Sequence, residues 1–330
     1  MPLVTIIIPC YNEQDTIGLL LEAIYAQSYP LSDMEVVIAD GLSTDQTRQQ
    51  IQNFQREHPD LVVRVVDNVR RTIPSGLNAA IRAAQGQVII RLDAHSIPYP
   101  DYVARCEAAL RAGYGENVGG VLEILPGSQG LLAKSIAAAA ALPLGAGDAR
   151  YRIGGKAQVV DTVPFGAFHR SLVERVGYFD ETLLTNEDYE FNVRIRRSGG
   201  KVWMDPTIRT QYFARSTLGA LWRQYWRYGF WKAQMLRRYP LTLRWRQAIP
   251  PLFVLSLALF VVAAIWLPVF RWLLVLEILI YTLVVLAAGL QSATKDRYWP
   301  HLVGVPLALL GMHSAWGGGM LYGGFRHERI

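Results

Sequence analysis

Polar side chains that can bind metals or transfer protons follow apolar, β-branched runs at several points in the N-terminal part of the chain. The carboxyl ends of parallel strands meet at one edge of a sheet, where ligands bind. We therefore expect these side chains to face a common crevice. They are Tyr11 and Glu13 after the run 4–9, Asp40 at the end of the run 35–40, and Asp93 with His95 after the run 88–92.

Asp93 and His95 have the spacing of a divalent-metal site, because residues i and i+2 of an extended segment point the same way. The sequence contains neither G-x-G-x-x-G nor G-x-x-x-x-G-K-[ST], so a metal is the expected partner of a nucleotide's phosphates. Imidazole suits Mn²⁺ better than Mg²⁺. The alternative is that Asp93 is the sole protein ligand and His95 only donates a hydrogen bond near the diphosphate.

Further side chains are suited to hold the rest of a nucleotide. Asp40, followed by Gly41, can accept hydrogen bonds from a ribose or a base edge, although a cap or a solvated loop is the alternative. The loop after the run 62–66 and the start of the next helix are expected to reach the nucleobase or the phosphates. The residues concerned are Arg70, Arg71, Gly76 and Asn78, with tight packing as the alternative for Gly76 and a solvated side chain for Arg70.

The pattern of the first 92 residues alternates between strands and helices. Four apolar runs, 4–9, 35–40, 62–66 and 88–92, are separated by three segments with helical spacing of their apolar residues. This alternation predicts an α/β fold with a mainly parallel sheet and helices on both faces.

A further helix is expected to begin at Tyr189, directly after Asn186, Glu187 and Asp188. Acidic residues are favoured in the first turn of a helix, so these residues are either a cap or a catalytic group. If they are catalytic, Asp188 is the candidate general base, because a carboxylate at this place can take a proton from a hydroxyl group.

The last quarter of the chain predicts a membrane segment. The stretches 249–267 and 272–290 are long and apolar enough to cross a bilayer. The stretch 302–322 is a third candidate, but His313 and three consecutive glycines at 317–319 leave a re-entrant piece open. Glu277 in the second stretch is either interfacial or functional. Lys295, Arg297 and the basic residues before 249 place these flanks in the cytoplasm; Arg326 and Arg329 conflict with a third crossing.

A basic and aromatic segment, 215–247, precedes the first apolar stretch. No acidic residue occurs between Asp205 and Glu277, whereas arginines alternate with tryptophans and tyrosines there. This mixture of basic and aromatic residues is typical of a membrane interface. The net charge of +6 therefore points to membrane lipids, and no zinc or RNA-binding signature indicates nucleic acid. We expect three parts: residues 1–214, an interface segment 215–247, and a transmembrane segment 248–330.

Five blocks of sequence resemble a family 2 glycosyltransferase of the GT-A fold. They are Ile6-Ile7-Ile8-Pro9-Cys10-Tyr11-Asn12-Glu13, Asp40-Gly41-Leu42-Ser43-Thr44-Asp45-Gln46-Thr47, Asp93-Ala94-His95, Asn186-Glu187-Asp188, and Gln224-Tyr225-Trp226-Arg227-Tyr228. The last block resembles the Q-x-x-R-W of membrane polysaccharide synthases, with Tyr in place of Trp. The segments Arg91–His95 and Val160–Gly166 resemble the succinoglycan-biosynthesis glucosyltransferase branch.

The resemblance implies an inverting transfer of a sugar, glucose in a β-linkage, from a UDP-sugar to a lipid-linked (polyprenyl diphosphate) glycan. It implies a divalent metal, Mn²⁺ or Mg²⁺, at Asp93 and His95, where the commoner pattern has a second Asp. It makes Asp188 the base, with Glu187 beside it. The donor would be bound by Pro9, Tyr11, Glu13, Asp40, Arg71, Gly76, Asn78 and Asp93, and the diphosphate or acceptor by Gly166, Gln224, Arg227 and Tyr228.

The expected place is the inner (plasma) membrane, with several spans and a cytoplasmic catalytic domain. Three alternatives remain open. One is a processive polysaccharide synthase, which the few spans disfavour. The second is a non-glycosyl nucleotidyltransferase, which gives no reason for an acidic block followed by Q-x-x-R-Y beside a membrane. The third is a non-catalytic membrane scaffold that kept the fold.

Overall fold

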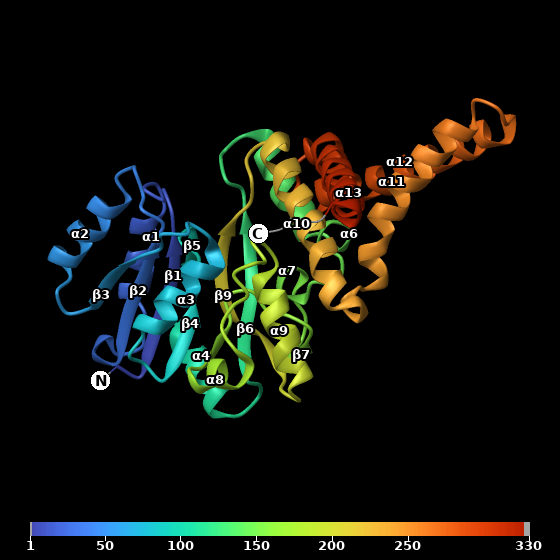
Figure 1. Cartoon of the computed structure of the whole chain (residues 1–330). Helices are drawn as coiled ribbons and strands as arrows, with labels where there is room; N and C mark the ends of the chain where they lie inside the picture. The colour runs from blue at the N-terminus through green and yellow to red at the C-terminus, as the bar shows by residue number, and fades with distance from the viewer. Residues whose placement is uncertain (1, 327–330) are drawn as a thin grey trace. The chain divides into compact units, whose positions relative to one another are not determined.

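The β-branched runs of the N-terminal part form parallel strands, as the sequence predicts (Figure 1). The structure, a computed structural model, describes residues 2–326. Four strands lie in the order β3-β2-β1-β4, and each pairs with its neighbour in parallel. They are β1 (Val4–Cys10), β2 (Met34–Asp40), β3 (Val62–Asp67) and β4 (Val88–Arg91). Their bounds agree with the predicted runs to within one residue, so their carboxyl ends share one edge.

Beyond β4 the sheet becomes largely antiparallel. The strand order continues β8-β6-β9-β5, and β7 pairs with β9. These strands are β5 (Ser96–Pro98), β6 (Asn117–Leu125), β7 (Gln158–Val160), β8 (Ala167–His169) and β9 (Val202–Phe213). Because β8 runs antiparallel to β4, the residues that enter β8 lie beside the carboxyl end of β4.

Helices cover both faces of the sheet. Alternate residues of β1 point to opposite sides: Ile6 and Ile8 belong to one buried cluster and Ile7 to the other. The first cluster is completed by α1 (Ile17–Tyr25), α2 (Thr47–Glu57) and α4 (Tyr102–Arg111), and the second by α3 (Ile73–Ala83), α8 (Ser171–Val176) and α9 (Glu187–Arg197). The shorter helical segments are η1 (Leu31–Asp33), α6 (Pro143–Ala146), α7 (Arg150–Ile153) and η2 (Pro240–Thr242).

The chain divides into two compact units. The first contains the residues up to Glu123 together with Arg150–Tyr212, and the second contains Ile124–Ala149 and the chain from Phe213 onward. The division into residues 1–214, 215–247 and 248–330 that the sequence predicts stays a prediction.

The second unit is helical, with α5 (Leu131–Ala141), α10 (Leu218–Arg238), α11 (Trp245–Ala263), α12 (Pro268–Asp296) and α13 (His301–Phe325). Among the described residues, α11 and α12 are the two helices long and apolar enough to cross a membrane. They are drawn in orange in Figure 1. Helix α12 begins at Pro268, and proline is well tolerated at the first helical position.

The third apolar stretch is also a continuous helix, α13, but it is not among the two candidate spans. Its glycines allow close packing within the second unit. A Cβ atom on Gly319 would lie 2.3 Å from the Trp226 carbonyl oxygen of α10. Ala137 and Ala139 of α5 are buried in a cluster with residues of α13, so the small side chains of α5 allow close packing as well. Arg329 lies outside the described residues.

Candidate active site

The loops after β1 and β2 are joined into one platform. The backbone N–H of Asn12 donates to Ser43 Oγ at 2.9 Å, and the N–H of Thr44 donates to Asn12 Oδ1 at 2.9 Å. Asn12 and Leu42 adopt left-handed backbone conformations, with φ of 53° and 60°. Such strain persists only where the surroundings impose it, and it concentrates at functional sites.

Asp40 is buried beneath this platform and stabilises it through hydrogen bonds. Its side chain is fully buried, and its carboxylate accepts hydrogen bonds from the Ser43 backbone N–H at 3.1 Å and from Arg48 Nε at 2.5 Å. Ser43 Oγ donates to the second carboxylate oxygen at 2.5 Å. Asp40 therefore shapes the turn on which a nucleotide would lie, and a direct contact with a ribose or a base stays a prediction.

Tyr11 is an exposed aromatic residue of the platform. The residue is 44% exposed, and the Arg71 guanidinium carbon lies 5.9 Å from the ring centroid. Gly76 lies beneath, where a Cβ atom would approach Asn68 Nδ2 to 2.9 Å and Pro9 Cβ to 3.3 Å. These contacts show that Gly76 permits tight packing, the alternative considered for it, and the donor-binding roles of Pro9 and Gly76 stay predictions.

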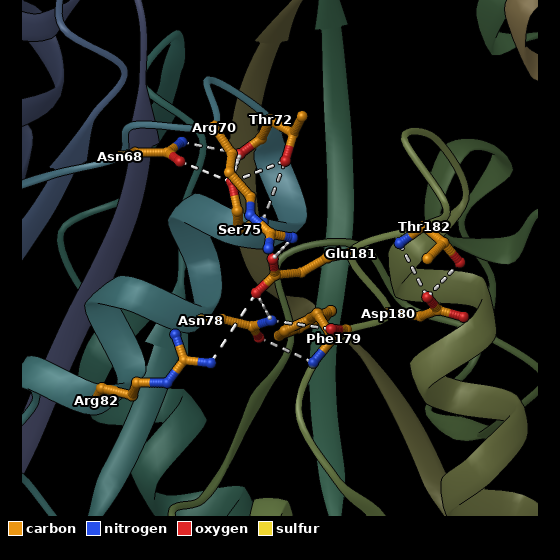
Figure 2. Close-up of polar contacts among 10 residues, drawn as sticks. All are labelled: Asn68, Arg70, Thr72, Ser75, Asn78, Arg82, Phe179, Asp180, Glu181 and Thr182. Carbon is orange, nitrogen blue, oxygen red and sulfur yellow. Dashed lines mark hydrogen bonds and ion pairs between the residues drawn. The ribbon is translucent and has the colours of Figure 1, made fainter. Parts of the chain in front are cut away.

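Asn78 of α3 and Arg70 of the preceding loop contact the segment 179–181 (Figure 2). Asn78 is buried; its amide nitrogen donates to the Phe179 carbonyl and to Glu181 Oε1, both at 2.9 Å. Its amide oxygen accepts the Phe179 N–H at 2.9 Å. Arg70 Nη1 lies 2.8 Å from Glu181 Oε2. A contact between Asn78 and the donor, which stays a prediction, would have to form in addition to these bonds.

Three acidic residues that the sequence singles out meet at one arginine. Arg91, the last residue of β4, is 3% exposed, and its Nη2 atom lies 3.0 Å from both Asp93 Oδ1 and Glu187 Oε1. Its Nη1 atom donates to Asp188 Oδ1. The sheet edge and the start of α9 thus bring Asp93, Glu187 and Asp188 together around Arg91, a residue to which the sequence analysis gives no role.

Arg91 carried a signal in the sequence. It is a charged residue that directly follows the apolar residues 88–90, and a buried charge requires ionic or hydrogen-bonding partners. The missed inference was that the carboxylates placed at this edge would be those partners.

The cluster shifts the proton affinity of its members. Burial raises the pKa of Asp188 and Arg91 opposes this, but the neighbouring Glu187 and Asp93 raise it again, so the pKa of Asp188 lies at about 7. Burial lowers the pKa of Arg91, and the three carboxylates more than compensate, so the pKa of the guanidinium lies above its ordinary value. A carboxylate with a pKa near neutrality is suited to general base catalysis.

His95 is held by Glu13. Its Nδ1 atom lies 3.1 Å from Glu13 Oε1, and Thr16 Oγ1 donates to Glu13 Oε2 at 2.7 Å. Burial raises the pKa of Glu13, but the hydrogen bonds from His95 and Thr16 and the His95 charge lower it below its usual value. When a carboxylate accepts a hydrogen bond from one ring nitrogen of a histidine, the other ring nitrogen is suited to bind a metal, as in carboxylate–histidine–metal arrangements. In this respect Asp93 and His95 fit a divalent cation. No cluster of three or more acidic, histidine or cysteine side chains at residues 2–326 is arranged to hold one.

The sequence profile described as Glycosyl transferase family 2 matches residues 5–177, just over half of the chain. The chain belongs to this family. The match includes the platform, Arg91, Asp93 and His95 of this glycosyltransferase, and it ends before Glu187 and Asp188.

Full-length relatives of the glycosyltransferase come from an archaeon and a bacterium. A dolichyl N-acetyl-α-D-glucosaminyl phosphate 3-β-D-2,3-diacetamido-2,3-dideoxy-β-D-glucuronosyltransferase of Methanococcus voltae is 27% identical over 95% of this chain and 94% of the relative. The succinoglycan biosynthesis protein ExoA of Rhizobium meliloti (strain 1021) is 29% identical over 95% and 92%. A mannosyltransferase from Pyrobaculum calidifontis, solved with GDP-Man and Mn²⁺, has a TM-score of 0.65, 22% identity, and coverage of 94% and 87%. This last likeness supports the GT-A fold.

The residues predicted to bind the diphosphate or the acceptor come from two parts of the glycosyltransferase chain, residue 166 and helix α10. The Gly166 carbonyl accepts the backbone N–H of Arg91 at 3.0 Å, and a Cβ atom on Gly166 would lie 2.1 Å from Asn117 Oδ1. Gln224, Arg227 and Tyr228 belong to α10 in the second unit, where Gln224 Nε2 donates to the Tyr228 hydroxyl at 3.0 Å. Their closure over the active site stays a prediction.

Proposed function

We propose that this glycosyltransferase moves a sugar, glucose in a β-linkage, from a UDP-sugar to a lipid-linked glycan during exopolysaccharide or cell-surface glycan synthesis. The observation that carries the proposal is the cluster of Asp93, Glu187 and Asp188 around Arg91. In this proposal Asp188 of the cluster acts on the acceptor hydroxyl, and Asp93 with His95 would hold a metal that binds the donor. The relatives named for lipid-linked and succinoglycan glycans support the choice of acceptor.

The proposed reaction is one in-line displacement at the anomeric carbon. The acceptor oxygen forms a bond to that carbon as the bond to the diphosphate oxygen breaks, and the electron pair leaves with UDP. Asp188 takes the hydroxyl proton, for which a pKa of about 7 is suited. A divalent cation, Mn²⁺ or Mg²⁺, held by Asp93 and His95, would supply positive charge for the departing diphosphate.

The acceptor's lipid gives the membrane segment its role. The helices α11 and α12 are long and apolar enough to cross a bilayer, and α10 carries basic and aromatic side chains. We place the enzyme at the inner (plasma) membrane with its active site on the cytoplasmic side. Gln224, Arg227 and Tyr228 would then meet the diphosphate and the lipid-borne acceptor.

The test is sugar incorporation into lipid. The enzyme in proteoliposomes receives radiolabelled UDP-glucose, Mn²⁺ and an extract of polyprenyl-linked glycans, and label in the organic phase is counted. Transfer to the lipid fraction supports the proposal. Nucleotide turnover without incorporation contradicts it, and so does inertness across UDP-glucose, UDP-galactose, UDP-GlcNAc and GDP-mannose.

A further inference from the structure

The cluster around Arg91 has an unusual charge balance for a metal site. One guanidinium faces the carboxylates of Asp93, Glu187 and Asp188, and all three lie within ion-pair distance of it. Arg91 is nearly inaccessible to solvent, so its charge is poorly screened. A second cation that approaches Asp93 therefore meets a fixed positive charge at close range.

The geometry separates two contributions of Arg91. Its Nη1 and Nη2 atoms hold Asp188 and Glu187 at the start of α9, which fixes the direction of the expected base. Nε and Nη2 lie 3.3 and 3.0 Å from the same oxygen of Asp93, Oδ1. The first contribution depends on the planar fork of the guanidinium, and the second on its charge.

We propose that Arg91 is a positioning residue that orients Asp188 and Glu187 and, by its charge, limits the affinity of the site for a free divalent cation. The metal then binds firmly only together with the donor's diphosphate, whose negative charges offset Arg91. This inference rests on the proposed function, because the diphosphate is that of the donor.

This arrangement has a chemical consequence. A site with three uncompensated carboxylates would hold a free cation tightly, and the cation would then pull Asp188 and Glu187 away from the acceptor. With Arg91 present, the carboxylates are already paired, so Asp188 keeps its orientation before and after the metal arrives. Arg91 thus joins the expected metal ligand Asp93 to the expected acceptor-side residues Asp188 and Glu187.

The test compares Arg91→Gln and Arg91→Lys with the wild-type enzyme in detergent. Binding of Mn²⁺ is followed by the loss of the free-ion EPR signal, with and without UDP. We expect UDP to raise the Mn²⁺ affinity of the wild type at least tenfold. Arg91→Gln should bind Mn²⁺ alone at least tenfold more tightly than the wild type, while its kcat falls at least a hundredfold.

Arg91→Lys separates charge from geometry. It keeps the positive charge, so its Mn²⁺ affinity without UDP should stay within about threefold of the wild type, yet without the fork its kcat should fall at least tenfold. Arg64→Gln is the matched control. It removes another arginine whose carboxylate partner, Glu35, is buried, 2.6 Å away, and should change neither Mn²⁺ binding nor kcat.

The inference is overturned if folded Arg91→Gln binds free Mn²⁺ no more tightly than the wild type, or if Arg91→Lys transfers sugar at the wild-type rate. Should Arg91→Gln not fold, the Lys variant decides the question, because it must keep Mn²⁺ binding and lose turnover. Failure of the proposed function looks different: the wild type itself would transfer no sugar, whatever its affinity for Mn²⁺.

Discussion

Asp188 is the residue on which the proposed chemistry depends most. Replacing it with Asn keeps the size of the side chain and removes its ability to accept a proton. Because general base catalysis contributes about a hundredfold to ten-thousandfold, we expect Asp188→Asn to lower kcat by about that factor with little change in the KM for the donor. Asp101→Asn, on the surface beside Arg105, is the control and should transfer at the wild-type rate. Near-normal turnover by Asp188→Asn would rule out its role as the base.

The raised pKa of Asp188 predicts a pH dependence. Only the carboxylate can take the acceptor proton, and it is lost as the pH falls through the pKa of about 7. We expect kcat/KM for the acceptor to fall about tenfold for each pH unit below that value and to level off above it. The measurement is a rate profile between pH 5.5 and 8.5 at fixed Mn²⁺ concentration. A flat profile over this range would show that no group with this pKa limits the reaction.

The sequence singled out three carboxylates, but it predicted neither their contact nor the residue that joins them. Asp93, Glu187 and Asp188 were recognisable because each follows an apolar run or begins a helix. Arg91 was missed because a basic residue in a strand has no periodic signature, and its partners come from position 93 and from almost a hundred residues further along. Asp40 was singled out because it ends a strand, whereas its hydrogen bonds within the local turn with Ser43 could be seen only in the fold.

At the scale of elements, the parallel half of the sheet follows from the sequence and the antiparallel half does not. Strands β1, β2 and β4 are mostly apolar runs buried on both faces, and the edge strand β3 is a β-branched run that is only partly buried. By contrast, β5, β7 and β8 have three residues each, too few for a hydrophobic period to appear. They are strands only because longer neighbours offer them backbone partners.

The contact between α3 and the segment 179–181 predicts a remote effect on catalysis (Figure 2). Asn78→Ala leaves the buried N–H of Phe179 without its acceptor, which costs about 1–3 kcal/mol of unfolding free energy. The segment that leads to Glu187 and Asp188 is then less firmly held. We therefore expect a lower melting temperature and a reduced kcat, with the KM for the donor nearly unchanged.

Arg70→Ala is the matched comparison, since it removes a mostly exposed ion pair to Glu181, the same partner that Asn78 contacts. Exposed ion pairs contribute little, so stability should change by less than about 1 kcal/mol. A KM for the donor that rises sharply in Asn78→Ala, with kcat unchanged, would instead favour a direct donor contact.

At the scale of the whole molecule, the chain combines a glycosyltransferase fold with a helical unit that carries two membrane-competent helices. The apolar stretches predicted these two helices, although not their ends: α11 covers Trp245–Ala263 rather than 249–267, and α12 begins at Pro268 rather than at 272. The third stretch was harder to interpret. Its glycines allow α13 to pack closely against α10, and composition alone does not distinguish such a helix from a re-entrant segment.

The orientation of the hairpin formed by α11 and α12 is testable by cysteine labelling. Both native cysteines, Cys10 and Cys106, are buried, so the background is low. A cysteine in place of Ile265, at the tip, should react with a membrane-impermeant maleimide in intact cells, because the tip is expected outside. A cysteine in place of Lys295 should react only after the cells are opened. The reverse pattern would place the active site on the wrong side for a cytoplasmic UDP-sugar.

The most direct test of the central claim is the configuration of the sugar in the product. An α-configured UDP-glucose that reacts by a single displacement, with Asp188 as the base, must give a β-linked product. NMR of the glycan released from the lipid gives the anomeric coupling constant without reference to the structure. A large coupling, typical of a β-glucoside, is the predicted result. A small coupling, typical of an α-glucoside, would contradict the single displacement and the role of the carboxylate cluster in it.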